Sequence, residues 1–137
     1  MLQKMARERY GLEINAGPFD TDSVPALVAE KFAETQGKGA AFHKAVMQAF
    51  WQQARAINDP HVLAELAENV GLDTKNFAAA LEDPSYQNAV FEDIRLAQEY
   101  GLSGVPALIF ADHYLVSGAQ PYEMLKQVVE RVQQEGN

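Results

Sequence analysis

The sequence contains no cysteine. This absence excludes disulfide bonds, thiolate metal ligands and a cysteine nucleophile within these residues. Long apolar runs are also missing, because the longest, residues 105–111, falls far short of the roughly 18 residues that a membrane span needs. The first residues, 1–4, lack the apolar stretch of a signal peptide. We therefore expect a cytoplasmic protein that does not interact with membranes.

Basic residues are scarce as well. The chain has 11 Lys and Arg against 19 Asp and Glu, a formal net charge of −8. Such a surface repels phosphate backbones, so nucleic acid is not an expected partner. His43, His61 and His113 fall on different predicted elements at no metal-ligand spacing. With no glycine-rich phosphate loop or serine elbow either, we expect no metal, no cofactor and no catalytic residue.

What is present is an ordinary globular composition. The 137 residues are 47% hydrophobic and 22% charged, enough for a single domain with a sizeable core. Helix-start signals recur along the first two-thirds: a capping residue stands just before a helical pattern, often with proline in the first turn. Helices are expected over residues 2–9, from Ser23 to about Thr35, over 40–56, and after each of three aspartates, Asp59, Asp73 and Asp83.

The pattern changes after Gly101. Residues 106–110 form a short apolar run, and residues 113–117 alternate between apolar and polar. The Ala111-Asp112 pair between them is short enough for a tight hairpin turn. A final amphipathic helix follows residue 121, and its predicted inward side chains are Met124, Leu125, Val128, Val129 and Val132.

The order of these motifs carries a family resemblance. Ser103-Gly104-Val105-Pro106 opens an apolar strand, a hairpin follows, and residues 117–121, Ser-Gly-Ala-Gln-Pro, open the last helix. This order resembles the C-terminal half of DsbA-like domains of the thioredoxin superfamily and is most similar to the FrnE-type subgroup. Within the helical block, residues 36–38, 59–63 and 71–73 resemble the inserted helical subdomain of that family, so the resemblance covers about residues 22–134.

The resemblance implies a fold that is mostly α with a β-hairpin. A helical insertion subdomain would occupy about residues 22–100, and residues 101–137 would form the strand–strand–helix (ββα) half of a thioredoxin fold. Together, residues 1–137 would be a single partial DsbA-like domain. The family's Cys-x-x-Cys lies in a βαβ unit that would precede residue 1. We therefore expect this chain, a fragment or a natural short relative, to be redox-inactive by itself.

The resemblance also implies a binding site. The residue that matches Pro106 is cis in this family and lies beside the reactive cysteines. A cis Val105–Pro106 bond would turn the Val105 backbone outward to pair with an extended thiol or disulfide substrate. The expected substrate-binding residues are Gly104, Val105 and Pro106, with secondary contacts from Ser117, Gly118, Ala119 and Gln120.

The sequence is compatible with three functions. The resemblance favours a thiol–disulfide oxidoreductase acting on a thiol or disulfide peptide or protein. The second is a glutathione-dependent isomerase or kappa-type transferase, whose relatives tend to have Gly-Gln-Asp-Arg where this chain has Gly118-Ala119-Gln120-Pro121. The third is a non-catalytic binding or assembly module.

Self-association is a further expectation. Without the family's first strand, the strand at residues 106–110 would have an open edge, and an isolated two-stranded hairpin is marginally stable. We therefore expect a homo-oligomer, in its simplest form a dimer whose two hairpins join edge to edge into a four-stranded sheet.

Overall fold

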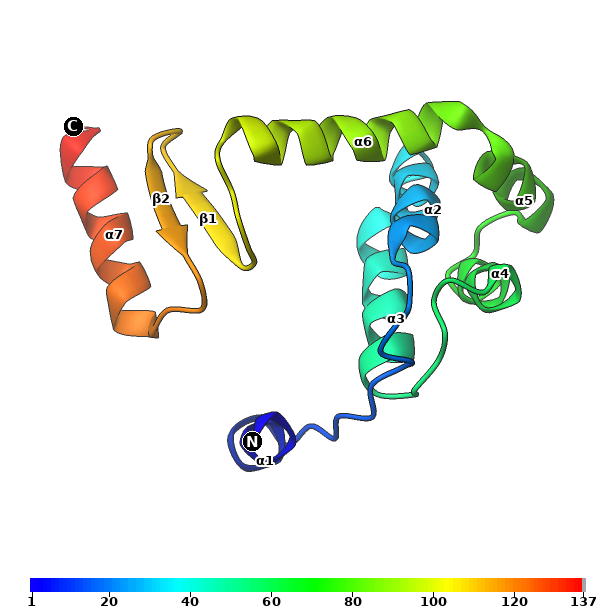
Figure 1. Ribbon diagram of the computed structural model, residues 1–137, viewed down its shortest axis with the longest axis horizontal. Helices are drawn as coiled ribbons and strands as arrows, with labels where there is room; N and C mark the ends of the chain where they lie inside the picture. The colour runs from blue at the N-terminus through cyan, green and yellow to red at the C-terminus, as the bar shows by residue number, and fades with distance from the viewer. Residues whose placement is uncertain (137) are drawn as a thin grey trace. The chain divides into compact units, whose positions relative to one another are not determined.

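A computed structural model describes residues 1–136 of the chain. Within these residues the fold is mostly helical with one antiparallel hairpin, as predicted. None of the helices there is both long enough and apolar enough to span a bilayer. The elements in chain order (Figure 1) are α1 Leu2–Tyr10, α2 Val24–Thr35, α3 Gly39–Trp51, α4 Pro60–Asn69, α5 Thr74–Glu82, α6 Pro84–Glu99, β1 Ala107–Phe110, β2 Tyr114–Ser117 and α7 Tyr122–Glu135.

The chain forms two compact units, residues 1–93 and residues 94–137. The boundary between them falls within α6. The sequence pattern changes a little later, after Gly101.

Three predicted capping residues start their helices. The carboxylates of Asp59, Asp73 and Asp83 each accept a backbone N–H from the first turn of the following helix, at 2.8 Å. Helix α2 differs: Ser23 occupies the cap position without a side-chain bond, and Asp22 accepts the Val24 N–H at 2.9 Å. The start of α2 was therefore predicted at the right place but with the wrong capping side chain.

Helix α3 ends at Trp51, five residues before the predicted end at residue 56. The cause lies far away in the sequence. The N–H groups of Asn15 and Gly17 donate to the carbonyls of Trp51 and Phe50, at 2.8 and 2.7 Å, and so occupy the end of the helix. Ala54, with a φ of +55°, then turns the chain and donates its N–H back to Asn15.

The core of the first unit lies between α2, α3, α4 and α5, with the bulky side chains of Phe42, Leu63 and Phe77 fully buried. The Phe77 ring lies 6.1 Å from the Phe32 ring and 5.9 Å from the Phe42 ring, centroid to centroid. Phe77 therefore joins α5 to both α2 and α3.

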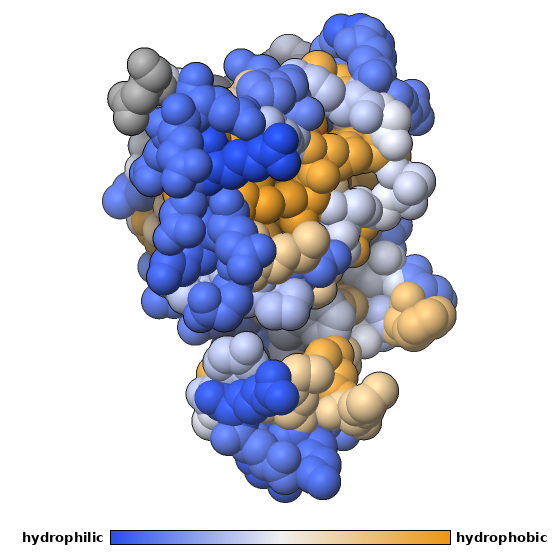
Figure 2. All heavy atoms as spheres, turned by 90° about the vertical axis from the view of Figure 1, so that its left-hand side faces the viewer, coloured by the Kyte–Doolittle hydropathy of each residue, from blue (hydrophilic) through white to orange (hydrophobic). Residues whose placement is uncertain are grey.

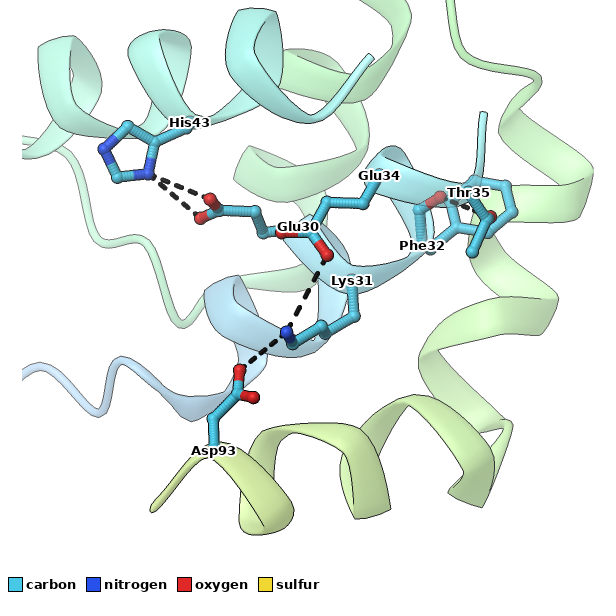
Figure 3. Close-up of polar contacts among 7 residues, drawn as sticks. All are labelled: Glu30, Lys31, Phe32, Glu34, Thr35, His43 and Asp93. Carbon is cyan, nitrogen blue, oxygen red and sulfur yellow. Dashed lines mark hydrogen bonds and ion pairs between the residues drawn. The ribbon is translucent and has the colours of Figure 1, made fainter. Parts of the chain in front are cut away.

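Surface ion pairs connect α2 to its neighbours (Figure 3). The Glu30 carboxylate lies 3.0 Å from His43 Nδ1 on α3. Lys31 Nζ lies 2.6 Å from the carboxylate of Asp93 on α6 and 3.7 Å from that of Glu34. The hydrogen bond to Asp93 is the main reason that the pKa of Lys31 is raised. Exposed pairs of this kind contribute little stability each, so the core carries most of it.

In the second unit, the hairpin loop is longer than predicted. Phe110 pairs with Tyr114, which leaves a three-residue loop instead of a two-residue turn. Ala111 and Asp112 adopt φ values of +50° and +61°, and the His113 N–H donates to the Phe110 carbonyl at 3.2 Å. The turn is thus completed by His113, a residue that the alternating pattern had assigned to the strand.

Helix α7 packs on one face of this hairpin. The Tyr114 hydroxyl donates to the Glu135 carboxylate, and the Arg131 guanidinium lies 5.4 Å from the centre of the Tyr114 ring. The hydrogen bond raises the pKa of Tyr114 and lowers that of Glu135. Val116 lies on the same face as Tyr114, because side chains alternate along a strand, and it is buried.

The apolar stripe of α7 is buried less than the sequence suggests. Leu125, Val128 and Val132 are half-buried, whereas Met124 and Val129 remain 44% and 39% exposed. Val116 is the one buried residue among residues 94–136, and it is still 7% exposed. The second unit therefore has a thin core, since a two-stranded sheet offers α7 a narrow surface.

Replacement of Phe77 by alanine should lower the free energy of unfolding by about 3–5 kcal/mol, because the cavity removes ring contacts to two helices. Urea unfolding followed by far-UV circular dichroism measures this change. Phe91→Ala is the matched control, since Phe91 is 50% exposed, and it should lower stability by less than about 1 kcal/mol. Equal losses from the two variants would contradict the described core.

Candidate functional site

The loop before β1 is open to solvent. The peptide bond between Val105 and Pro106 is cis, the conformation that the family resemblance implies. The Val105 side chain is 94% exposed. Ser103, Gly104 and Pro106 are exposed as well, and no heavy atom of the described residues lies within 4 Å of where a Cβ of Gly104 would stand.

A second loop, residues 117–120, lies against the first. The Gly118 N–H donates to the carbonyl of Pro106 at 2.8 Å, and Gly118 has a φ of +78° that favours glycine. The Gln120 side-chain amide donates to the Ser117 carbonyl at 2.9 Å, which closes this loop on itself. Ala119 is exposed beside them. The structure thus brings the primary and secondary groups of predicted site residues together.

The same hydrogen bond identifies the free edge of the hairpin. Hydrogen-bonded and non-hydrogen-bonded pairs alternate along an antiparallel ladder. Because Pro106 is bonded to Gly118, the next residue of β1 that faces β2 is Leu108. The backbone groups of Ala107 and Ile109 therefore point away from β2. Within residues 1–136 the sheet has only these two strands, so this edge carries no neighbouring strand.

An apolar face borders the free edge. Ile109 and Leu115 stand opposite each other in the register, on the face away from Tyr114 and α7. Ile109 is half-buried and Leu115 is 50% exposed. Figure 2 shows that hydrophobic surface (orange) lies beside hydrophilic side chains (blue) on the face that it presents. The edge can therefore offer both main-chain hydrogen bonds and apolar contact.

The chemistry of these loops suits binding. Residues 103–106 and 117–120 contain no charged side chain, no thiol and no imidazole. Their polar groups are backbone amides and carbonyls, two serine hydroxyls and one carboxamide. No group here has the adjacent base that activates a nucleophile. Residues 103–106 and 117–120 therefore offer hydrogen-bonding groups but no pair of nucleophile and base.

The histidines take no part in this site. His43 pairs with Glu30, and His113 Nδ1 lies 2.6 Å from the Ala111 carbonyl in the hairpin loop. His61 is exposed on α4. In the described part of the chain, no three His, Cys, Asp or Glu side chains gather as a metal site would require.

Sequence reasoning missed a cavity in the first unit. It has a volume of about 560 Å³ and lies between α2, α4, α5 and the start of α6. Its lining includes Asp22, Asp83 and Pro60, which the sequence marks only as helix-start residues or their neighbours. A capping motif shows where a helix begins, but it does not show that three such starts lie side by side.

Replacement of Gly118 by alanine should loosen the contact between the two loops. A side chain at positive φ costs about 1–2 kcal/mol, so hairpin amide protons should exchange about 5- to 30-fold faster with solvent deuterium. Nuclear magnetic resonance measures this exchange. Gly104→Ala is the control, because that position is open and has no positive φ, and it should leave the rates nearly unchanged. Unaltered amide exchange in Gly118→Ala would contradict the described contact between the two loops.

Comparison with known proteins places these features in a family. The profile of the DSBA-like thioredoxin domain matches residues 1–130. The match begins at α1, whereas the resemblance noted in the sequence begins at about residue 22. The chain is 35% identical over 121 residues to the uncharacterized protein YwbO of Bacillus subtilis, an alignment covering 86% of this chain and 60% of that protein.

It is also 31% identical over 112 residues to the ClpXP adapter protein SpxH of Bacillus subtilis, covering 76% of this chain and 38% of that protein. The chain thus spans about 60% or less of the length of these two relatives.

Two solved structures show the same fold. A probable DsbA oxidoreductase from Streptomyces coelicolor superposes with a TM-score of 0.77 at 26% identity, covering 98% of this chain and 68% of that one. The cytosolic disulfide reductase DsbM from Pseudomonas aeruginosa superposes with a TM-score of 0.61 at 28% identity, covering 86% of this chain and 62% of that one. The chain therefore belongs to the DSBA-like thioredoxin domain family.

Proposed function

We propose that the chain forms the substrate-binding wall of a DsbA-like thiol–disulfide oxidoreductase and holds an extended thiol or disulfide peptide or protein. The observation that carries the proposal is the position of Val105. Val105 is 94% exposed, and it leads into a strand whose outer edge has no neighbouring strand among residues 1–136.

Binding would follow the geometry of strand addition. An extended peptide laid along β1 exchanges main-chain hydrogen bonds with the outward groups of Ala107 and Ile109. Its side chains alternate between two faces, and those on one face meet Ile109 and Leu115. Ser117 and Gln120, in the loop joined to Pro106, lie where they add polar contacts to the same peptide.

The proposal assigns recognition to this chain and leaves the exchange step elsewhere. Disulfide exchange needs a thiolate nucleophile, and these 137 residues contain no cysteine. By itself the chain is redox-inactive. We also assign it to the FrnE-type subgroup on the order of residues 103–106, the hairpin and residues 117–121.

A second candidate is a binding module that needs no redox chemistry. One relative, at 31% identity, is named a ClpXP adapter protein, and the loops described here lack a nucleophile. On this candidate the same edge presents or captures a polypeptide without exchanging a disulfide. A cytoplasmic location suits both candidates, and the similarity to a reductase named as cytosolic supports it.

We expect the chain to bind an unfolded, thiol-blocked peptide along β1. The probe is insulin B chain with carbamidomethylated cysteines, titrated into the ¹⁵N-labelled chain. Amide shifts are expected at Gly104, Val105 and residues 107–109. Ile109→Pro should weaken binding about five- to tenfold, because it deletes one outward N–H that the hairpin ladder does not use. Ile109→Val keeps that N–H and should bind within about twofold of the parent.

Shifts confined to other residues, or equal affinity in the two variants, would reject binding at this edge. Insulin reduction with dithiothreitol, followed by turbidity, then separates enzyme from binder. No acceleration by this chain is expected, and acceleration would contradict the assignment of chemistry elsewhere. Titration with glutathione tests the isomerase or transferase alternative. Amide shifts at residues 117–120 would support that alternative.

We further propose that the free chain self-associates through the same edge. Two copies of β1 would pair and give a four-stranded sheet, which satisfies outward backbone groups that otherwise bond to water. Sedimentation velocity at tens of micromolar should show a dimer, and Ile109→Pro should shift it to monomer while Ile109→Val does not. A monomeric parent chain at these concentrations would contradict the proposal.

A further inference from the structure

The cavity of the first unit has the form of a small-molecule site. Its volume of about 560 Å³ falls within the range of roughly 300–1,000 Å³ that is common for ligand pockets. Its apolar wall is supplied by α2, α4 and α5. The side chains of this wall belong to Val28, Leu63, Ala64, Phe77, Ala78 and Leu81.

The deep part of this wall belongs to the packed core of the first unit. Leu63 and Phe77 are fully buried, and the Phe77 ring contacts two other aromatic rings. Ala78 on α5 is exposed and lies toward the mouth. The small side chains of Ala64 and Ala78 leave the space open, because larger residues at these positions would fill it. The cavity is therefore a pre-formed apolar recess on a packed scaffold.

The charges around the recess have one sign. Asp22, Glu82 and Asp83 are among the lining residues, and no Lys, Arg or His is. Asp22 and Asp83 each use one carboxylate oxygen to cap a helix. The bond from the Ser85 N–H lowers the pKa of Asp83, which keeps that carboxylate ionised.

Helix N-termini add positive partial charge at the same rim. The starts of α2, α4 and α6 contribute residues to it, and each start carries about half a unit of positive charge. The capping carboxylates Asp22 and Asp83, together with Asp59 at the start of α4, offset these partial charges. Glu82 stands at the C-terminal end of α5, where the helix dipole is negative, so a net negative field remains at the mouth.

We propose that this recess binds a small organic cation with an apolar body, such as a hydrophobic primary amine. The apolar body lies against Ala64, Ala78 and Leu81, the side chains of the apolar wall that are not fully buried. The ammonium group stays at the mouth, near the carboxylates of Glu82, Asp22 and Asp83. An organic anion of the same shape contacts the same apolar wall, but the negative charges at the mouth repel its head group. This site is distinct from the β1 edge and independent of the function proposed for it.

The test is a titration of the full ¹⁵N-labelled chain with phenylbutylamine, phenylbutanol and phenylbutyrate. These probes share an aromatic body and differ in the charge of the head group. Amide shifts are expected in the residues that line the recess. The amine should bind about threefold or more tighter than the alcohol, in line with the modest strength of partly exposed ion pairs, and the anion should bind most weakly.

Two variants with matched controls locate the site. Ala78→Phe fills the recess and should weaken amine binding by at least about tenfold. Ala79→Phe makes the same change at the next residue of α5, which is exposed and does not line the recess; it should leave binding unchanged. Glu82→Gln should weaken amine binding about threefold and leave alcohol binding unchanged. The control is Glu68→Gln, at an exposed glutamate of α4 outside the recess. It should change the binding of neither probe.

Binding of phenylbutyrate as tight as that of phenylbutylamine would overturn the proposal. So would equal weakening by Ala78→Phe and Ala79→Phe, or the absence of shifts in the lining residues at millimolar amine. Amide spectra of each variant confirm that it is folded, and both alanines are exposed, so the fold should tolerate either change.

Discussion

The hydrogen bond from the Gly118 N–H to the Pro106 carbonyl determines what the C-terminal unit presents to solvent. It begins the antiparallel ladder at the cis bond, so it sets which residues of β1 face β2 and which face outward. It also holds residues 117–120 against residues 103–106. With that bond in place, the outward groups of Ala107 and Ile109 form one continuous line with the exposed Val105.

Helix α7 makes the hairpin asymmetric. Its contacts with Tyr114, through Glu135 and Arg131, cover one face of the hairpin. The other face, with Ile109 and Leu115, adjoins the free edge. A partner strand would therefore find outward backbone groups beside the half-buried Ile109 and the half-exposed Leu115. The thin core of this unit fits the same account, because a hairpin with one covered face buries little until a strand is added.

Local signals predicted much of the fold, and distant contacts account for the rest. The starts after Asp59, Asp73 and Asp83 were predictable because each carboxylate bonds within its own helix turn. The end of α3 was not, because Asn15 and Gly17 terminate it from more than thirty positions away. The predicted loops of the site do meet at Pro106 and Gly118. The cavity escaped prediction because its wall comes from four helices whose mutual packing no local pattern encodes.

The family match and the absence of cysteine concern different parts of the chemistry. The profile matches residues 1–130, and it does so in a chain with no thiol. The matched residues include α1 to α6, the hairpin and the first part of α7. On the function proposed above, the exposed loop and the hairpin edge would hold a polypeptide, whereas a thiolate, which these residues do not contain, would perform the exchange. The proposal therefore separates recognition, which it assigns to residues 103–120, from the exchange step.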